Sequence, residues 1–134
     1  MPKTVLTVTT RQAVQFVDVT REVQRALDGT GVREGTCTVF VPHTTAAVTI
    51  NENADPDVPH DLALGLAALA PDLPGFRHAE GNSAAHLKSS LVGCSVVVPV
   101  EGGRLQLGTW QAVFFCEFDG PRSRSLWVTA QGER

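Results

Sequence analysis

Apolar and polar residues alternate along most of this chain, a pattern typical of β-strands with one buried face. The alternation predicts strands towards both ends of the sequence, over residues 3–9, 13–19, 35–41, 45–52, 94–100, 105–107, 110–118 and 123–129. Hairpin-length connections join several of these strands, and such connections favour antiparallel pairing over βαβ winding. We therefore expect a mostly antiparallel or mixed β-sheet.

Three segments show helical spacing and helix-end signals, over residues 21–28, 56–70 and 83–92. Thr20 is placed to cap the first helix, Asp55 the second, and Asn82 or Ser83 the third. Combined with the strands, these helices predict an α+β fold with about three helices in the middle of the chain. We expect one domain over residues 1–134.

The predicted strand over residues 45–52 has two unlike faces. Its apolar face points towards a core, and its other face is small and polar, consisting of Thr45, Ala47, Thr49 and Asn51. Because the Pro-His-Thr-Thr break before this strand exposes the His43 imidazole at a sheet rim, we expect the small face to leave room for a ligand beside it.

The predicted strand over residues 110–118 also carries polar residues on an otherwise apolar face. One face is plainly core, made of Trp110, Ala112, Phe114, Cys116 and Phe118. The opposite face carries Gln111 and Glu117 among apolar residues, and a polar group there needs a partner. Arg122 and Arg124 follow across the next turn, so we expect Glu117 to pair with one of them.

Composition excludes several function classes. The chain has 134 residues, 43% of them hydrophobic, a net charge of -3 and a pI of about 5.7. An acidic chain without a basic block is not a general nucleic-acid binder. The longest apolar run, residues 62–70, is half of what a membrane span needs. No secretory segment opens the chain, and its three cysteines form no CxxC pair, so we expect reduced, buried thiols and a cytoplasmic protein.

Polar residues with chemical potential fall into three clusters. The first joins His43 and Thr44 to the oxygen-rich segment Asn51, Glu52, Asn53 and Asp55, which suits Mg²⁺ or the edge of a heterocycle. A structural alternative is that Asn53 and Asp55 only turn the chain and cap a helix. Asp61, on the helix that follows, is placed to face the His43 rim.

The second cluster surrounds the start of the third helix, where unpaired amides form a natural phosphate site. His78, Glu80 and Asn82 precede that helix and project together if the segment is extended. His86 and Lys88 lie within it, but two helical residues two apart point about 200° away from each other, so both cannot face one ligand. The alternative is a capped surface helix with incidental histidine and lysine.

In the third cluster, we expect Gln111 to hydrogen-bond to the edge of a ligand base and Arg122 to contact a phosphate. Across the clusters, His43, His78 and His86 are candidate ligands of a divalent metal such as zinc, although their spacing matches no known metal motif. A cofactor, if present, is thus expected to be Mg²⁺ or Zn²⁺.

The clusters together resemble the YjbQ family. The segments that carry the resemblance are HTTAAVTINENAD at residues 43–55, EGN at 80–82, AHLK at 85–88, LGTWQ at 107–111 and EFDGPR at 117–122. The resemblance implies a compact trimer of α/β subunits with its pocket near subunit contacts. It also implies a secondary thiamine-phosphate synthase activity, which joins hydroxymethylpyrimidine diphosphate to thiazole phosphate and releases pyrophosphate.

The first hypothesis is therefore a cytoplasmic transferase of the thiamine-phosphate synthase type, acting on a small phosphorylated metabolite. Its expected catalytic residues are His43, Asp61, Glu80 and His86. Its expected substrate contacts are Thr44, Asn51, Glu52, Asn53, Asn82, Lys88, Gln111 and Arg122. Two alternatives stay open: a metal-dependent hydrolase with Glu80 as general base, and a non-catalytic trimeric binding module for a phosphorylated metabolite.

Overall fold

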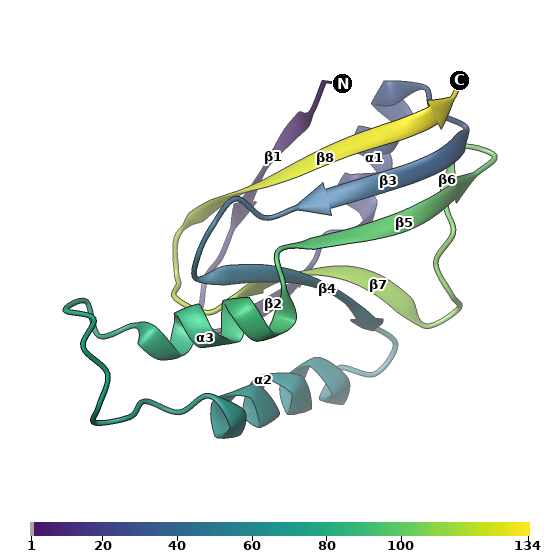
Figure 1. Cartoon of the computed structure of the whole chain (residues 1–134). Helices are drawn as coiled ribbons and strands as arrows, with labels where there is room; N and C mark the ends of the chain where they lie inside the picture. Colours follow the sequence, from purple (N-terminus) through teal and green to yellow (C-terminus); the bar gives the residue numbers. More distant parts are fainter. Residues whose placement is uncertain (1) are drawn as a thin grey trace.

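The computed structural model describes residues 2–134 and contains eight strands and three helices. The strands are β1 (Thr4–Thr9), β2 (Gln15–Asp18), β3 (Glu34–Phe40), β4 (Ala46–Glu52), β5 (Ser95–Glu101), β6 (Arg104–Leu105), β7 (Gln111–Glu117) and β8 (Ser123–Glu133). The helices are α1 (Thr20–Thr30), α2 (Asp57–Leu69) and α3 (Ser83–Val92). Figure 1 shows the two chain ends at the same end of the molecule.

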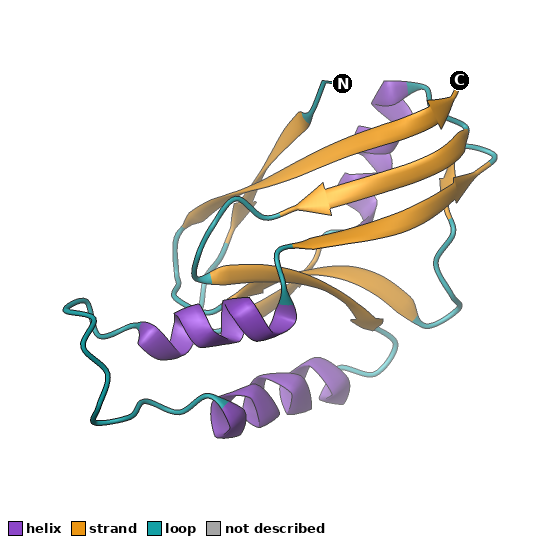
Figure 2. Ribbon diagram, in the orientation of Figure 1, coloured by secondary structure: helices purple, strands orange, loops and turns teal. Residues whose placement is uncertain are grey.

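The strands form two sheets, and every strand pair is antiparallel. The larger sheet has the order β1-β8-β3-β5-β6, and the smaller has the order β2-β7-β4. Figure 2 shows the larger sheet above the smaller one, with α2 and α3 beneath. The predicted α+β class is confirmed.

The main core lies between the two sheets and α1. The apolar stripe of α1, Val23, Ala26 and Leu27, is buried there. It meets the inward-facing residues of both sheets, among them Val39 and Phe115, which are fully buried. The period of 3.6 in the helix and of two in the strands places these side chains on facing surfaces.

A second, smaller core lies on the other face of the small sheet. Ala47, Phe114 and Cys116 pack there with Ala85 of α3, so β7 is buried on both faces. The small side chains on this face of β4 let α3 approach the strand closely, and the Ser89 hydroxyl donates to the carbonyl of Ala46 at 2.7 Å. The helix α3 covers this face at Ala47, so only its Thr45 end, beside His43, lines a hollow.

Three other local predictions differ from the structure. The Thr20 side chain does not cap α1; its hydroxyl accepts a hydrogen bond from the N–H of Val113 at 2.8 Å. Trp110 is 62% exposed rather than core, because it precedes β7 in a turn. Cys37 and Cys116 are buried as expected, but Cys94 is exposed.

The second helix is the least buried of the three helices. No residue of α2 is buried, and Leu64 and Leu69 are 66% and 75% exposed. Asp55 supports its start as predicted, since its carboxylate accepts from the N–H of Asp57 at 2.9 Å. Within residues 2–134, no helix has the length and apolar character needed to cross a membrane.

Candidate functional site

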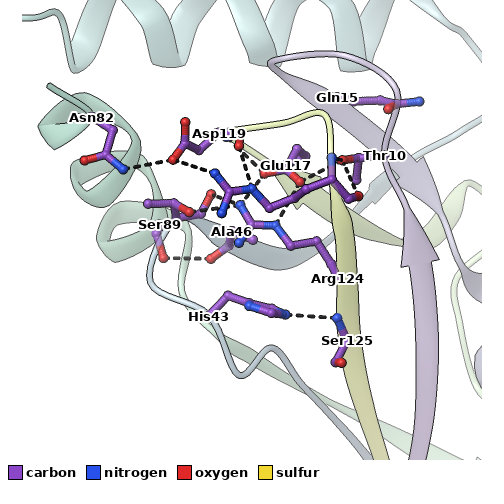
Figure 3. A network of polar contacts seen from close by, with 12 residues as sticks. Thr10, Gln15, His43, Ala46, Asn82, Ser89, Glu117, Asp119, Arg124 and Ser125 are labelled. Atoms are coloured by element: carbon purple, nitrogen blue, oxygen red, sulfur yellow. Dashed lines mark hydrogen bonds and ion pairs between the residues drawn. The ribbon is translucent and has the colours of Figure 1, made fainter. Parts of the chain in front are cut away.

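Four segments of the chain meet at one end of the strands of the small sheet. They are the β3–β4 connection, the loop before α3, the first turns of α3, and the β7–β8 turn. Figure 3 shows side chains from these segments pointing towards one another around Arg124. The site therefore depends on the tertiary fold, because residues about 80 positions apart in the chain contribute to it.

A buried ion pair forms the floor of the site. Glu117 is fully buried at the end of β7, and the guanidinium of Arg124 on β8 donates to both of its carboxylate oxygens. Thr10 and the N–H of Asp119 also donate to this carboxylate, at 2.8 and 3.0 Å. Burial alone would raise the pKa of Glu117, but these hydrogen bonds and the arginine charge hold it below its ordinary value. The predicted pairing of Glu117 is thus confirmed, with Arg124 as the partner.

Arg124 also ties the ion pair to the strand break beside His43. Its guanidinium donates to the hydroxyl of Thr45 at 2.9 Å and to the Thr45 carbonyl at 3.2 Å. Gly120, in the β7–β8 turn, has no room for a side chain: a Cβ there would lie 2.3 Å from the carbonyl oxygen of Gln12 and 2.8 Å from Glu117. The floor is therefore tightly packed and has a defined geometry.

Asp119 connects this floor to the start of α3. One of its carboxylate oxygens accepts from the Asn82 amide at 2.8 Å and from the Arg122 guanidinium at 3.1 Å. Because the Asn82 amide donates to Asp119, its side chain does not cap α3. The other amide atom, Oδ1, is buried and has no hydrogen-bond partner among the described residues.

His43 lies on the β3–β4 connection with one ring nitrogen already in use. Its Nε2 accepts a hydrogen bond from the backbone N–H of Ser125 at 2.9 Å, as Figure 3 shows. Partial burial and the nearby Arg124 charge lower the pKa of His43 below its ordinary value, outweighing the opposite effect of Glu117. The imidazole is therefore neutral at physiological pH.

The other wall carries two more histidines. The rings of His78 and His86 meet edge to face, with their centroids 5.3 Å apart. His78 Nε2 lies 3.9 Å from the Glu80 carboxylate, and this pair is largely exposed to solvent. These three side chains can form hydrogen bonds with a ligand at the mouth of the site.

The segments enclose a hollow of about 420 Å³, within the size range of small-molecule sites. It is lined by Pro42, His43, Thr44, Thr45, His78, Glu80, Asn82, His86, Asp119, Arg122 and Arg124. A larger hollow of about 690 Å³ lies along α1 and β6. That hollow is lined mainly by exposed charged side chains, whereas the smaller one rests on a buried polar network, so we take the smaller as the candidate site.

The structure brings seven of the predicted site residues to this one pocket: His43, Thr44, His78, Glu80, Asn82, His86 and Arg122. It places the remaining six elsewhere: Asp61, Asn51, Glu52, Asn53, Lys88 and Gln111.

Each residue outside the pocket has a local explanation. Asp61 does not face His43; its carboxylate lies 3.0 Å from the ring of His60 on exposed α2. The segment 51–53 lies at the far end of β4, about 20 Å of strand away from the pocket, where Asn53 donates to Asp18. Lys88 is buried against the ring of Phe118, on the other side of α3 from His86.

Gln111 is likewise used locally. Its side-chain oxygen accepts from the N–H of Gly108 at 2.8 Å, within the turn that begins β7. Its contribution is to the turn, at the opposite end of β7 from Glu117.

The geometry does not support the expected zinc arrangement. Within residues 2–134, no group of three or more His, Cys, Asp or Glu side chains is close enough to hold a metal ion. His43, His78 and His86 line the same pocket, but only the last two have rings in contact. Binding of Mg²⁺ or Zn²⁺ stays a prediction.

The predicted site residues omit Asp119 and Arg124 of the pocket wall, and they omit Thr45 although it belongs to the small strand face predicted to leave room beside His43. Arg124 carried a usable signal, because a glutamate on an apolar strand face requires a cationic partner. Asp119 is part of an Asp-Gly-Pro turn. Such a pattern predicts a turn, and it does not indicate that the aspartate also accepts a hydrogen bond from Asn82.

Fold and pocket together define an α+β protein with a polar hollow between two strand connections and a helix N-terminus. Comparison with known proteins identifies the family: residues 4–133 match the model described as "UPF0047 protein YjbQ-like". The chain belongs to this YjbQ family, so the predicted resemblance is confirmed.

Individual relatives agree with this membership. The UPF0047 protein YugU of Bacillus subtilis is 50% identical over 128 residues, 95% of this chain and 97% of YugU. The crystal structure of an uncharacterised YjbQ/UPF0047 protein from Clostridium acetobutylicum has 47% identity and a TM-score of 0.92, covering 96% of this chain and 99% of that one. A YbjQ-like protein of unknown function from Sulfolobus solfataricus has 32% identity and a TM-score of 0.93, covering 98% and 97%.

These comparisons correct the expected activity. The relatives are described as UPF0047 proteins, as uncharacterised or as of unknown function, and none of these three descriptions mentions thiamine-phosphate synthesis. The assignment as a thiamine-phosphate synthase is therefore wrong, and the assignment as a transferase is withdrawn with it. The metal-dependent hydrolase gains no support either, since the described residues form no metal cluster.

Proposed function

We propose that this protein binds a small molecule through an oxyanion group of the phosphate class, in the pocket between His43, Asn82 and His86. The observation that carries the proposal is the convergence of hydrogen-bond donors from four chain segments on one hollow of about 420 Å³. Donors that converge on a compact volume suit a group with several oxygen acceptors.

The start of α3 supplies part of this donor set. The helix has ten residues, and no side chain caps its N-terminus. The N–H groups of Ala85 and His86 already donate to the Asn82 carbonyl. Ser83 and Ala84 therefore provide the first-turn N–H groups that remain for a ligand, and the helix dipole favours negative charge at this end. Arg122, on the opposite wall, keeps part of its guanidinium at the pocket while holding Asp119.

Two further features describe the rest of the ligand. Glu80 and Asp119 line the same hollow, so it does not suit a large, uniformly negative molecule. The buried Asn82 Oδ1 lacks a donor, and a buried acceptor without a partner is costly. A ligand hydroxyl or a bound water next to the anionic group would satisfy it, which favours a hydroxyl-bearing phosphate ester.

We also propose that the protein associates as a trimer, because α2 and α3 expose apolar side chains. Leu64, Leu69, Leu87 and Leu91 are all exposed on these two helices. Exposed leucines on neighbouring surface helices are the kind of side chains that protein–protein contacts bury. We expect three copies to associate, and sedimentation equilibrium checks this: a species of three times 14.3 kDa supports the trimer, and a monomer at all concentrations contradicts it.

Calorimetric titration with inorganic phosphate and with glycerol phosphate tests the binding function. We expect both to bind wild-type protein, the ester more tightly, and His86→Ala to weaken binding about tenfold, the effect of one lost charge-assisted hydrogen bond. His60→Ala is the matched control, because His60 lies on exposed α2 outside the pocket, and it should leave affinity unchanged. Titrations with and without Mg²⁺ show whether a cation takes part. Equal affinities for wild type and His86→Ala would contradict the proposal.

A further inference from the structure

His43 differs from the other two pocket histidines because one of its ring nitrogens is already hydrogen-bonded to the protein backbone. The N–H of Ser125 can only donate, and it points at Nε2 from 2.9 Å. An acceptor nitrogen must have a free lone pair, so Nε2 carries no proton. The single proton of the neutral imidazole is therefore on Nδ1.

The alternative ring placement does not fit. Rotation of the imidazole by 180° would put a carbon, with its hydrogen, where Nε2 accepts from Ser125. That arrangement would leave the β8 amide without an acceptor. Nδ1 itself makes no hydrogen bond with any residue from 2 to 134, and it is not among the buried unpaired atoms of that range. Since His43 lines the pocket, Nδ1 is the nitrogen that a ligand can reach.

We propose that His43 is the specificity-determining donor of the pocket: a neutral imidazole whose Nδ1–H donates to an oxygen atom of the ligand. The inference rests on the binding function proposed above and deepens it. It assigns His43 a role in recognition instead of proton abstraction, because a protonated Nδ1 cannot act as a base.

The surrounding charges support the neutral form. Arg124 and Arg122 line the same hollow as His43, each paired with a carboxylate, Arg124 with Glu117 and Arg122 with Asp119. Burial and Arg124 lower the pKa of His43, and Glu117 opposes them only in part. Protonation would also place a second donor against the Ser125 N–H. The other titratable groups of the pocket are His78, Glu80 and His86.

This arrangement has two consequences for the ligand. An Nδ1–H group donates to a phosphate, carboxylate or carbonyl oxygen, and it cannot hydrogen-bond to an ammonium or another group that only donates. A metal ion at Nδ1 would require the proton to move to Nε2, against the Ser125 N–H, so His43 is a poor metal ligand. Binding through His43 should therefore not depend on loss or gain of its proton near neutral pH.

The tautomer can be measured in the free protein without any ligand. Long-range ¹H–¹⁵N correlation of histidine-labelled protein should show a protonated Nδ1 and an unprotonated Nε2 for His43 between pH 7 and pH 8, where its lowered pKa keeps the ring neutral. A protonated Nε2 at His43, with or without a proton on Nδ1, would overturn the inference.

Two variants then test the contact with the ligand, with inorganic phosphate as the probe. In His43→Asn the amide group occupies the place of Nδ1, and in His43→Gln it occupies the place of Nε2. We expect phosphate affinity to stay within about threefold in His43→Asn and to fall about tenfold in His43→Gln, the value of one hydrogen bond. The reverse order overturns the inference. Absence of phosphate binding to wild-type protein would refute the proposed function, and the ring tautomer would still be decided by the spectra.

Discussion

The buried Glu117–Arg124 pair gives the most demanding prediction for stability. In Arg124→Met, the fully buried Glu117 carboxylate keeps only the Thr10 hydroxyl and the Asp119 N–H as donors. The Thr45 hydroxyl loses its donor as well, and the Thr45 carbonyl keeps only the N–H of Phe118. Removing one partner of a buried pair typically lowers the free energy of unfolding by about 3–5 kcal/mol, a large share of the 5–15 kcal/mol that a domain has.

The expected size of the effect can be stated for each assay. With an unfolding entropy of about 2.1 cal/mol/K per residue, 134 residues correspond to roughly 0.28 kcal/mol per degree. A loss of 3–5 kcal/mol thus lowers the Tm by about 11–18 °C. At a urea m-value of about 2 kcal/mol/M, the midpoint falls by roughly 1.5–2.5 M. Circular dichroism during urea titration at pH 7 measures the change.

Two further variants separate a lost ion pair from general disruption. Replacing both partners, as Glu117→Leu with Arg124→Met, removes the uncompensated charge and should recover most of the loss. Asp61→Asn removes an exposed pair with His60 and should change the free energy of unfolding by less than about 0.5 kcal/mol. A loss below about 1 kcal/mol in Arg124→Met, or a double variant less stable than Arg124→Met alone, would refute the reasoning.

The same pair predicts how stability depends on pH. The folded-state pKa of Glu117 lies below its unfolded value, so the unfolded chain takes up the proton first as pH falls. The stabilisation by this carboxylate is therefore complete above the unfolded pKa of about 4.3. It is lost as pH falls from there through the folded pKa. Arg124→Met should weaken this dependence between pH 5 and pH 3, and an unchanged acid limb would argue against the assignment.

Two other predictions concern packing and accessibility. Ala47 lies on the face of β4 that α3 covers, so Ala47→Leu should lower the free energy of unfolding by about 1–3 kcal/mol through overpacking. Urea denaturation measures this change. An unchanged midpoint would mean that α3 does not cover β4 closely. Cys94 alone should react with an aromatic disulfide reagent in native protein, since it is exposed while burial raises the pKa of Cys37 to about 11 and of Cys116 to about 12. Counting released thiolate gives one thiol in native and three in denatured protein; two or three fast thiols in native protein would contradict the described burial.

Much of the fold could be predicted from the sequence because its hydrophobic pattern is regular. The strand alternation, the α1 stripe and the helix-end residues each act locally, and the structure has the elements in the predicted order. The need of Glu117 for a cationic partner was also readable, since a carboxylate on an apolar strand face is costly without one.

The errors arise where one local pattern permits two tertiary outcomes. A face of small residues on β4 suits either a ligand or a closely packed helix, and only the position of α3 decides between them. Grouping His43 with Asn51 and Asn53 treated nearness in sequence as nearness in space. A seven-residue strand separates its ends by about 20 Å, so the predicted strand itself argued against that cluster.

The pocket was predictable only in part, for the same reason. The segment from His78 to His86 is local, and its residues do lie together. His43 and Arg122 reach them through strand pairing across the sheets, which the hydrophobic pattern does not specify. Helix geometry predicts that His86 and Lys88 point in opposite directions from α3. The structure agrees, because His86 lines the pocket while Lys88 lies against the ring of Phe118.

A phosphate titration followed by backbone amide resonances tests the account most directly. If the pocket binds an oxyanion, shifts should concentrate at residues 43–45, 78–86 and 119–125, with the first-turn amides of α3 and the Ser125 N–H among them. Shifts confined to the arginines along α1 and β6, or no saturable shift at all, would contradict the account.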